Sequence, residues 1–129
     1  LALGRPGEGV PLLERALAIS EAAYGPDHPD VAAWLGNLAA SFLALGRPGE
    51  GVPLLERALA ISEAAYGPDH PDVATLLGNL AASFHVLGRP GEAVPLLERA
   101  LAISEAAYGS DHPTSAALRH ALYYIRRVR

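Results

Sequence analysis

The sequence predicts an all-α fold, an α-solenoid of stacked antiparallel helix hairpins, from three observations. Residues 1–42 recur at residues 43–84 with only two differences, and a third copy begins at residues 85–113 with four. Within each copy, apolar residues return at intervals of three and four, as on one face of a helix. Clusters of Pro and Gly separate these helical stretches. A fixed period of this length is typical of repeat units that stack and bury one another's apolar sides.

Composition limits the classes of function. The 129 residues suffice for one domain, half of them are apolar, and Cys, Met and Lys are absent. Without cysteine, the chain has no disulfide framework, thiolate nucleophile or thiolate metal site. All fourteen acidic residues and six of the ten arginines lie in residues 1–113. Such an acidic body disfavours nucleic-acid binding, which needs a clustered basic face. We expect a cytoplasmic protein.

Two stretches, residues 31–46 and 73–88, contain no Asp, Glu, Lys or Arg. Each is shorter than the roughly 20 residues that a helix needs to span a bilayer. Each also contains Asn, Ser and two glycines. They are therefore predicted to be buried helices of a folded domain, and no membrane partner is expected.

One kind of helix, called B here, is predicted over residues 6–24, 48–66 and 90–108. Each begins at the proline of an Arg-Pro-Gly-Glu sequence. A proline in the first turn followed by a carboxylate is typical of a helix N-terminus. Gly67 is predicted to end the second B helix in a left-handed conformation, and Pro68 prevents its continuation.

Each B helix also contains an internal proline. Pro53 and its copies Pro11 and Pro95 lie several residues after the helix start. Proline removes a backbone hydrogen bond inside a helix and costs about 3 kcal/mol there. We therefore expect a distortion at each of the three positions, either a kink or a loosened first turn.

The other kind of helix, called A here, is predicted over residues 29–45, 71–87 and 113–128. Asp69 or His70 can cap the second A helix, with the following proline in its first position. Short connections between helices of this length make neighbours antiparallel. Trp34 stands where the other A helices have leucine, so it is predicted to lie in the core against the preceding B helix.

The helices follow in the order B-A-B-A-B-A within a single repeat domain over residues 1–129. Its parts are an unpaired B helix at 6–24, repeats at 29–66 and 71–108, and a capping helix at 113–128. The last helix carries Arg, His and Tyr where the other copies are small or apolar, as a terminal cap requires. The chain opens on the letters that end an internal unit. We therefore interpret it as the C-terminal part of a longer protein.

Small and large residues recur at fixed offsets in both helices. They are Leu38, Ala39 and Phe42 in an A helix, Gly46 at the turn, and Gly51, Leu55 and Ala58 in a B helix. A Gly-Pro-Asp-His-Pro-Asp-Val sequence precedes the A helix, which contains Asn-Leu-Ala. In these features the chain resembles the tetratricopeptide repeat, in its 42-residue, kinesin-light-chain-like form.

The resemblance implies a right-handed superhelix whose concave side is lined by A helices, and a protein or peptide as partner. Matching positions give the predicted peptide-binding residues, which are Asn37, Leu43, Thr75, Asn79, His85, His120, Tyr124 and Arg127. This lining is mostly small and uncharged, and it has no Lys or Arg before Arg127. The expected ligand is therefore an extended apolar or neutral peptide, gripped by the amides of Asn37 and Asn79.

No pattern in the chain predicts catalysis. The Asp-His pairs at 27–28, 69–70 and 111–112 lie one repeat apart, roughly 10 Å at usual helix-packing distances. Ligand bonds near ~2 Å cannot share an ion over that distance, so the pairs are interpreted as helix caps and no metal site is predicted. No nucleophile elbow, phosphate-binding loop or paired carboxylate occurs. We expect no catalytic residues, no cofactor and no enzyme activity.

The first B helix has no A helix before it. Its outward stripe is expected to expose an apolar patch, which monomers avoid. We therefore predict self-association, as a possible homo-oligomer, through Val10, Leu12, Leu13 and Leu17. Two alternatives to a peptide-binding scaffold stay open. They are a regulatory arm of a larger nucleotide-driven signalling protein and a pure self-assembly module.

Overall fold

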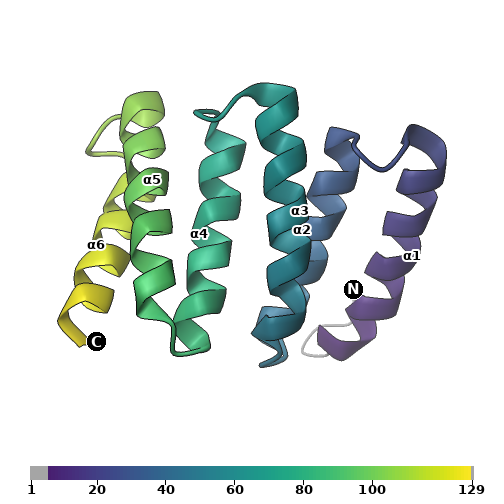
Figure 1. The fold of residues 1–129 in the computed structure, drawn as a ribbon, viewed down its shortest axis with the longest axis horizontal. Helices are drawn as coiled ribbons and strands as arrows, with labels where there is room; N and C mark the ends of the chain where they lie inside the picture. Colours follow the sequence, from purple (N-terminus) through teal and green to yellow (C-terminus); the bar gives the residue numbers. More distant parts are fainter. Residues whose placement is uncertain (1–5, 129) are drawn as a thin grey trace.

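The computed structural model describes residues 6–128 and contains six α-helices in this part of the chain. They are α1 (Pro6–Tyr24), α2 (Pro29–Ala44), α3 (Pro48–Tyr66), α4 (Pro71–Val86), α5 (Pro90–Tyr108) and α6 (Pro113–Val128). The helices stand side by side in sequence order, each antiparallel to the next (Figure 1). The fold is the predicted all-α solenoid, in which the B helices α1, α3 and α5 alternate with the A helices α2, α4 and α6.

A histidine caps each A helix. The Nδ1 atom of His70 accepts a hydrogen bond from the backbone N–H of Asp72 at 3.0 Å. His28 accepts the equivalent bond from Asp30, and His112 accepts it from Thr114. Each histidine ring also stacks on the tyrosine that ends the preceding B helix, with ring centroids 4.5, 4.6 and 4.7 Å apart in the three copies. Histidine, and not the aspartate before it, is therefore the capping residue.

Replacing His70 with alanine is expected to lower the free energy of unfolding by about 1 kcal/mol, the usual cost of losing an N-cap side chain. The Tyr66 ring loses its stacking partner in the same variant. Asparagine keeps a side-chain acceptor for the Asp72 N–H, so H70N should retain most of the stability. Urea denaturation of both variants measures the difference. Equal stability of H70A and the wild type would show that the cap contributes nothing.

Glycine ends both kinds of helix. Gly46 and Gly88 follow A helices and have φ angles of 74° and 75°. After the first of them, the N–H of Arg47 bonds to the carbonyl of Phe42 at 2.8 Å, as in a Schellman motif. Gly67 ends α3 with a positive φ of 91°, but its ψ of 161° lies outside the left-handed helical region that the sequence predicted. Only glycine adopts such angles without strain.

An arginine precedes two of the B helices and folds back on the turn before it. Arg47 donates two hydrogen bonds to the Glu50 carboxylate and lies 5.0 Å from the centroid of the Phe42 ring. Arg89 repeats both contacts before α5. The hydrogen bond from Arg47 lowers the pKa of the Glu50 carboxyl. The pair is exposed, so solvent screening leaves it little weight in the stability of the fold.

Each B helix continues without interruption through its internal proline. Pro53 lies in α3, and Pro11 and Pro95 occupy the same place in α1 and α5. All three prolines are exposed, as is Gly49, whose carbonyl loses its N–H partner to Pro53. Water can bond to that carbonyl instead. The prolines therefore remove a backbone hydrogen bond without interrupting the helices, and the predicted kink or loosened turn stays a prediction.

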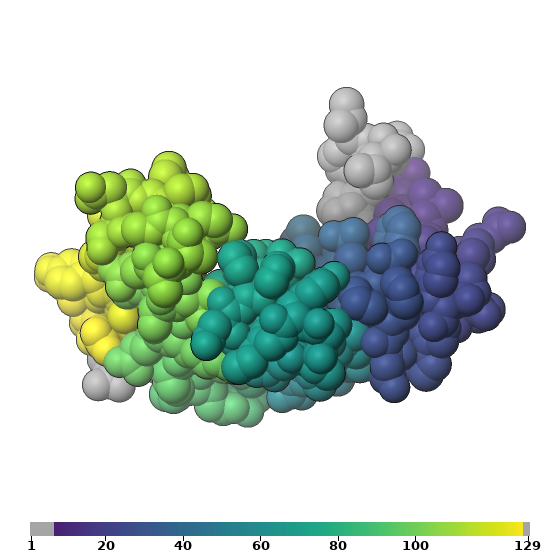
Figure 2. Space-filling view, turned by 90° about the horizontal axis from the view of Figure 1, so that it is seen from above, coloured from purple at the N-terminus to yellow at the C-terminus, as the bar shows by residue number. Residues whose placement is uncertain are grey.

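The helices pack in a row in which each touches the helix before and after it. The row bends along its length and is hollowed on one side (Figure 2). Fully buried leucines, such as Leu35, Leu55 and Leu77, hold neighbouring helices together in α2, α3 and α4. Within residues 6–128, no helix combines the length and the apolar character that crossing a bilayer demands.

Identical residues of the B helices differ in exposure according to their neighbours. Ile61 of α3 and Ile103 of α5 are 5% and 4% exposed, whereas Ile19, the same residue of α1, is 60% exposed. α3 and α5 each lie between two A helices, while α1 packs against α2. Within the described residues, α1 therefore presents an uncovered apolar face.

Trp34 is half-buried and lies outside the core, which contradicts the prediction. The Cδ2 atom of its counterpart Leu76 lies 3.4 Å from where a Cβ on Gly36 would be, and Leu118 approaches Gly78 in the same way at 3.7 Å. The position therefore lies beside the previous A helix as well as the core. Among the described residues no A helix precedes α2, so Trp34 lacks that neighbour.

Gly51 of α3 lies directly against α2. A Cβ at this position would be 3.1 Å from the carbonyl oxygen of Ala39 and 3.2 Å from its Cβ. The third copy has a fully buried alanine here, Ala93, so α4 and α5 already accommodate the methyl group. We expect G51A to stabilise the domain by up to ~1 kcal/mol, the propensity difference between Gly and Ala. Thermal denaturation measures it, and a loss of stability would show that α2 cannot move aside.

Candidate binding groove

The A helices line two adjoining hollows. The larger, of about 660 Å³, lies between α4 and α6 and has residues of α5 as its floor. The smaller, of about 340 Å³, lies between α2 and α4. Thr75 and Asn79 of α4 line both hollows. The two hollows therefore form one continuous surface across α2, α4 and α6, called the A-helix groove below.

Five of the eight predicted peptide-binding residues line the A-helix groove. Asn37 lines the smaller hollow, His85 and Tyr124 line the larger, and Thr75 and Asn79 line both. The rings of His85 and Tyr124 meet edge to face with centroids 6.0 Å apart. This contact joins α4 to α6 across the larger hollow.

The other three predicted residues, Leu43, His120 and Arg127, line neither hollow. Arg127 donates from Nη1 to the Tyr123 hydroxyl at 3.0 Å, and its guanidinium lies 5.5 Å from that ring's centroid. Its side chain is thus held along α6. His120 corresponds to Gly78, which borders the groove because another A helix follows α4. No A helix follows α6 in the described residues, so His120 has no such groove to line.

The B helices also contribute to the groove, which the sequence reasoning missed. Tyr66 lines the smaller hollow, while Tyr108, Leu97 and Ser104 line the larger. A signal was available, because the same tyrosine precedes glycine at the end of every B helix. Tyr66 and Tyr108 remain exposed while stacked on the capping histidines. These tyrosine rings thus lie at the edge of the groove, each with an apolar face and a polar hydroxyl.

Asn37 and Asn79 present free amides to the groove. Neither side-chain amide forms a hydrogen bond with any other group in residues 6–128. Each amide has two N–H donors and a carbonyl acceptor. The hydroxyl of Thr75 instead donates to the carbonyl of Pro71 at 3.4 Å. The two amides are therefore the polar groups best placed to bond with the backbone of a ligand.

Charge is unequal along the groove. No Asp, Glu, Lys or Arg lines the larger hollow, whereas Asp30 and Asp72 line the smaller. Their carboxylates lie 3.9 and 3.8 Å from the Nδ1 atoms of His28 and His70, which already accept backbone hydrogen bonds. The described residues place no arginine against either carboxylate. The groove therefore has a neutral half and an acidic half.

The histidines of the three Asp-His pairs serve as helix caps. Each bonds through Nδ1 to the N-terminus of the A helix that follows. Over residues 6–128, no three side chains of His, Cys, Asp or Glu come together in a way that could hold a metal ion. The groove therefore offers apolar surface, hydrogen-bonding groups and, in its smaller hollow, the carboxylates of Asp30 and Asp72.

Comparison with known families supports this description. The family model described as tetratricopeptide repeat matches residues 1–50, 32–105 and 72–122. These matches overlap and together cover nearly the whole sequence. The chain belongs to the tetratricopeptide repeat family. Repeats of this family generally form non-catalytic scaffolds for protein–protein interaction.

Two solved structures have a similar fold, and both contain the nearly identical TPR-like repeats of a Podosopora anserina protein described as a kinesin light chain. The first is 33% identical with a TM-score of 0.89, and the match covers 96% of this chain and 59% of that one. The second, a single-substitution variant, is 34% identical with a TM-score of 0.87 and coverages of 95% and 57%. The chain thus spans little more than half the length of either. The array is of the kinesin-light-chain-like type. A comparison with curated proteins gives no match.

Proposed function

We propose that this repeat array is a non-catalytic scaffold that binds an extended, apolar or neutral peptide in the A-helix groove. One observation carries the proposal. Two hollows meet at Thr75 and Asn79, and the free amides of Asn37 and Asn79 face them. An extended peptide has unpaired backbone N–H and C=O groups, which such amides can satisfy from the side.

The larger hollow favours an apolar or neutral side chain. Its lining contains no charged residue and includes the aromatic rings of Tyr108, Tyr124 and His85. A charged side chain buried there would lose hydration without gaining a partner, which is unfavourable. The smaller hollow can accept a basic group, because Asp30 and Asp72 border it. A neutral segment with a basic flank therefore fits the groove best.

Peptide binding can be tested with an array of immobilised twelve-residue peptides, followed by fluorescence anisotropy titration of the peptides that bind. The double variant N37A/N79A removes both free amides. It should weaken binding roughly tenfold to a hundredfold, since each lost hydrogen bond is worth about 1 kcal/mol. Y123A serves as the matched control, because Tyr123 is exposed and lines neither hollow. Peptides that bind N37A/N79A as well as wild type would contradict the proposal.

A second proposal concerns the uncovered face of α1, through which we expect two copies to associate. Leu12 is 63% exposed there and lies on the same helix as the exposed Ile19, while Leu13 is half-buried. Val10 and Leu17 are half-buried like their counterparts in the other B helices, so their exposure does not mark the free face. The proposed contact is therefore centred on Leu12 and Ile19, a residue absent from the sequence-based prediction.

Light scattering over a range of concentrations tests this association. The variant L12D/I19D should stay monomeric where the wild type dimerises. V86D is the control, since Val86 is an equally exposed aliphatic residue but lies at the end of α4, on a different helix from the proposed contact. A strictly monomeric wild type at high concentration would rule out association through α1. The cytoplasmic location is likewise a proposal, to be checked by imaging a fluorescently tagged copy.

A further inference from the structure

Consecutive B helices are joined by an arginine that reaches back across a turn. The Nη2 atom of Arg57 on α3 donates to the Glu21 carboxylate at 2.7 Å and to the Pro26 carbonyl at 2.9 Å. Glu21 lies on α1 and Pro26 in the turn between α1 and α2, so one guanidinium holds three elements together. Arg99 on α5 makes the same two contacts one repeat further along. This arrangement is called the arginine clamp below.

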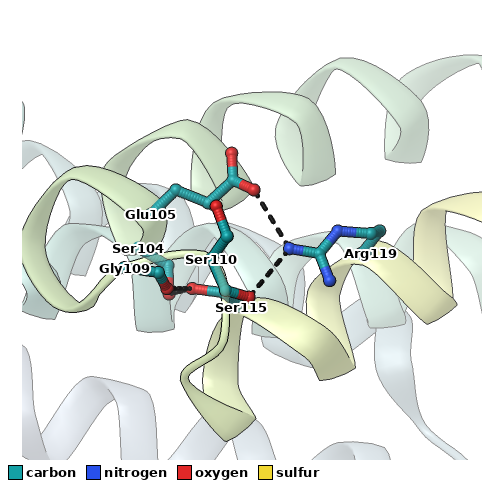
Figure 3. Close-up of polar contacts among 6 residues, drawn as sticks. All are labelled: Ser104, Glu105, Gly109, Ser110, Ser115 and Arg119. Carbon is teal, nitrogen blue, oxygen red and sulfur yellow. Dashed lines mark hydrogen bonds and ion pairs between the residues drawn. The ribbon is translucent and has the colours of Figure 1, made fainter.

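The third arginine clamp is closed by a different helix. Its acceptors are the Glu105 carboxylate on α5 and the Ser110 carbonyl in the following turn. No B helix follows α6 in the described residues. Instead Arg119 of α6 donates to both acceptors from Nη2, each at 3.0 Å (Figure 3). The residue that α4 has at this position is Leu77, which is fully buried.

Arg119 belongs to a stripe of α6 that differs as a whole from its counterpart in α4. In α4 the stripe is buried and consists of Leu77, Ala81 and Phe84. In α6 it is exposed and consists of Arg119, Tyr123 and Arg126. Arg126 forms an ion pair with Glu98 of α5. A B helix packed on α6 as α5 packs on α4 would bury two arginines, which is costly unless each keeps a partner.

The neighbouring position of α6 is changed as well. Gly36 and Gly78 allow a leucine of the next A helix to approach within 3.4 and 3.7 Å of the Cβ position. His120 occupies this place on α6, so a bulkier side chain stands at the position that the next leucine would approach. Both surfaces by which α6 could contact another repeat are therefore unsuited to it.

The opposite end of the molecule has the surface that an added repeat would present. The sequence of α1 is identical to that of α3, and its Ile19 is exposed. Arg15, the counterpart of Arg57, makes no hydrogen bond within residues 6–128. If two copies stacked end to end in the register of the repeats, Arg15 of the second copy would meet Glu105 of the first. Trp34 of the second copy would meet His120.

We infer that α6 prevents copies of this chain from stacking end to end, and that Arg119 does so by occupying the acceptors that Arg15 of a second copy would bind. Within residues 6–128 the face of α1 is uncovered, whereas the stripe of α6 is occupied by its own side chains. An interface between unlike ends would otherwise repeat without limit and give filaments. Pairing of two α1 faces remains possible, because that contact leaves α6 uninvolved and closes after two chains.

The attachment of α6 to α5 does not depend on the stripe. The Ser115 hydroxyl lies 2.8 Å from the Ser104 hydroxyl and donates to the Gly109 carbonyl at 2.9 Å (Figure 3). Leu122 and Ile125 are buried on the same side. The stripe can therefore be altered while the contacts that fold α6 onto α5 are kept.

The test variant R119L/H120G/Y123A/R126F gives α6 the residues that α4 has at the same four positions. Sedimentation velocity should show a mass that keeps rising with concentration, well beyond that of two chains, as expected for an open interface. The wild type should not grow beyond a pair of chains. Adding I19D to the variant should abolish the growth, since it places a charge on the receiving face of α1. Adding R15A should reduce it, because the incoming arginine clamp is lost.

Two outcomes would overturn the inference. One is a helical variant, shown by circular dichroism, whose mass equals that of the wild type at every concentration. The other is a wild type that itself grows without a plateau in a manner abolished by I19D. If the fourfold variant loses helicity, R119L/Y123A replaces it under the same criteria, because it keeps His120 and the Arg126–Glu98 pair. A monomeric wild type would reject only the α1 pairing proposed above.

Discussion

Replacing Ile61 with alanine is expected to lower the free energy of unfolding by about 2–5 kcal/mol, the usual range for truncating a large residue in a packed core. Ile61 is 5% exposed and packs in the core that links the helices. Truncation leaves a cavity that a row of rigid helices can fill only in part. Equilibrium unfolding in urea measures the loss as a lower midpoint at unchanged slope.

The chain provides its own control for this variant. Ile19 occupies the same position in a helix of identical sequence but is 60% exposed. I19A should therefore cost less than about 1 kcal/mol, as for surface substitutions generally. I103A should behave like I61A, because Ile103 is equally buried. Both variants are measured at concentrations where the chain is monomeric, because the proposed pairing through α1 would itself cover Ile19. If I19A then cost as much as I61A, the single chain would not expose the face of α1, and both proposals that depend on it would fail.

The repeat pattern made the fold predictable because local and global signals agree. Proline in the first turn and apolar residues on one face mark every helix, and a glycine follows each of the first five. The three copies also exclude alternatives that one copy would leave open, since a fixed period of this length is typical of repeat units that stack on one another. All six helices accordingly begin at the predicted prolines.

Features that depend on the neighbouring repeat could not be read from one copy. Trp34 was expected in the core because its counterparts are leucines. Those leucines lie against the previous A helix, and the described residues contain no A helix before α2. Leu43, His120 and Arg127 were placed in the groove by position alone. His120 lines neither hollow, because each hollow lies between two A helices and the described residues contain no A helix after α6. Ser115 was not noticed, although its hydroxyl replaces the buried Val73 and bonds to Ser104.

Replacing Pro53 with alanine is expected to raise the free energy of unfolding by about 2 kcal/mol. An internal proline costs a helix about 3 kcal/mol through its missing N–H and its clash with the preceding turn. Alanine also gives the unfolded chain more freedom, which reduces the gain by up to ~1 kcal/mol. Pro53 is exposed, so no buried contact of its ring opposes the gain. Thermal and urea unfolding of P53A measure the net effect.

Pro95, the equivalent proline of α5, provides a second test of this prediction. P95A should give a similar increase, and P53A/P95A should give nearly the sum, because α4 separates the two helices and distant substitutions act independently. A decrease in P53A would mean that the first turn of α3 is shaped around the proline and cannot take up the regained hydrogen bond. Internal prolines in all three B helices would then be part of how the hairpins dock, and an alanine in their place would strain the contact between α3 and α2.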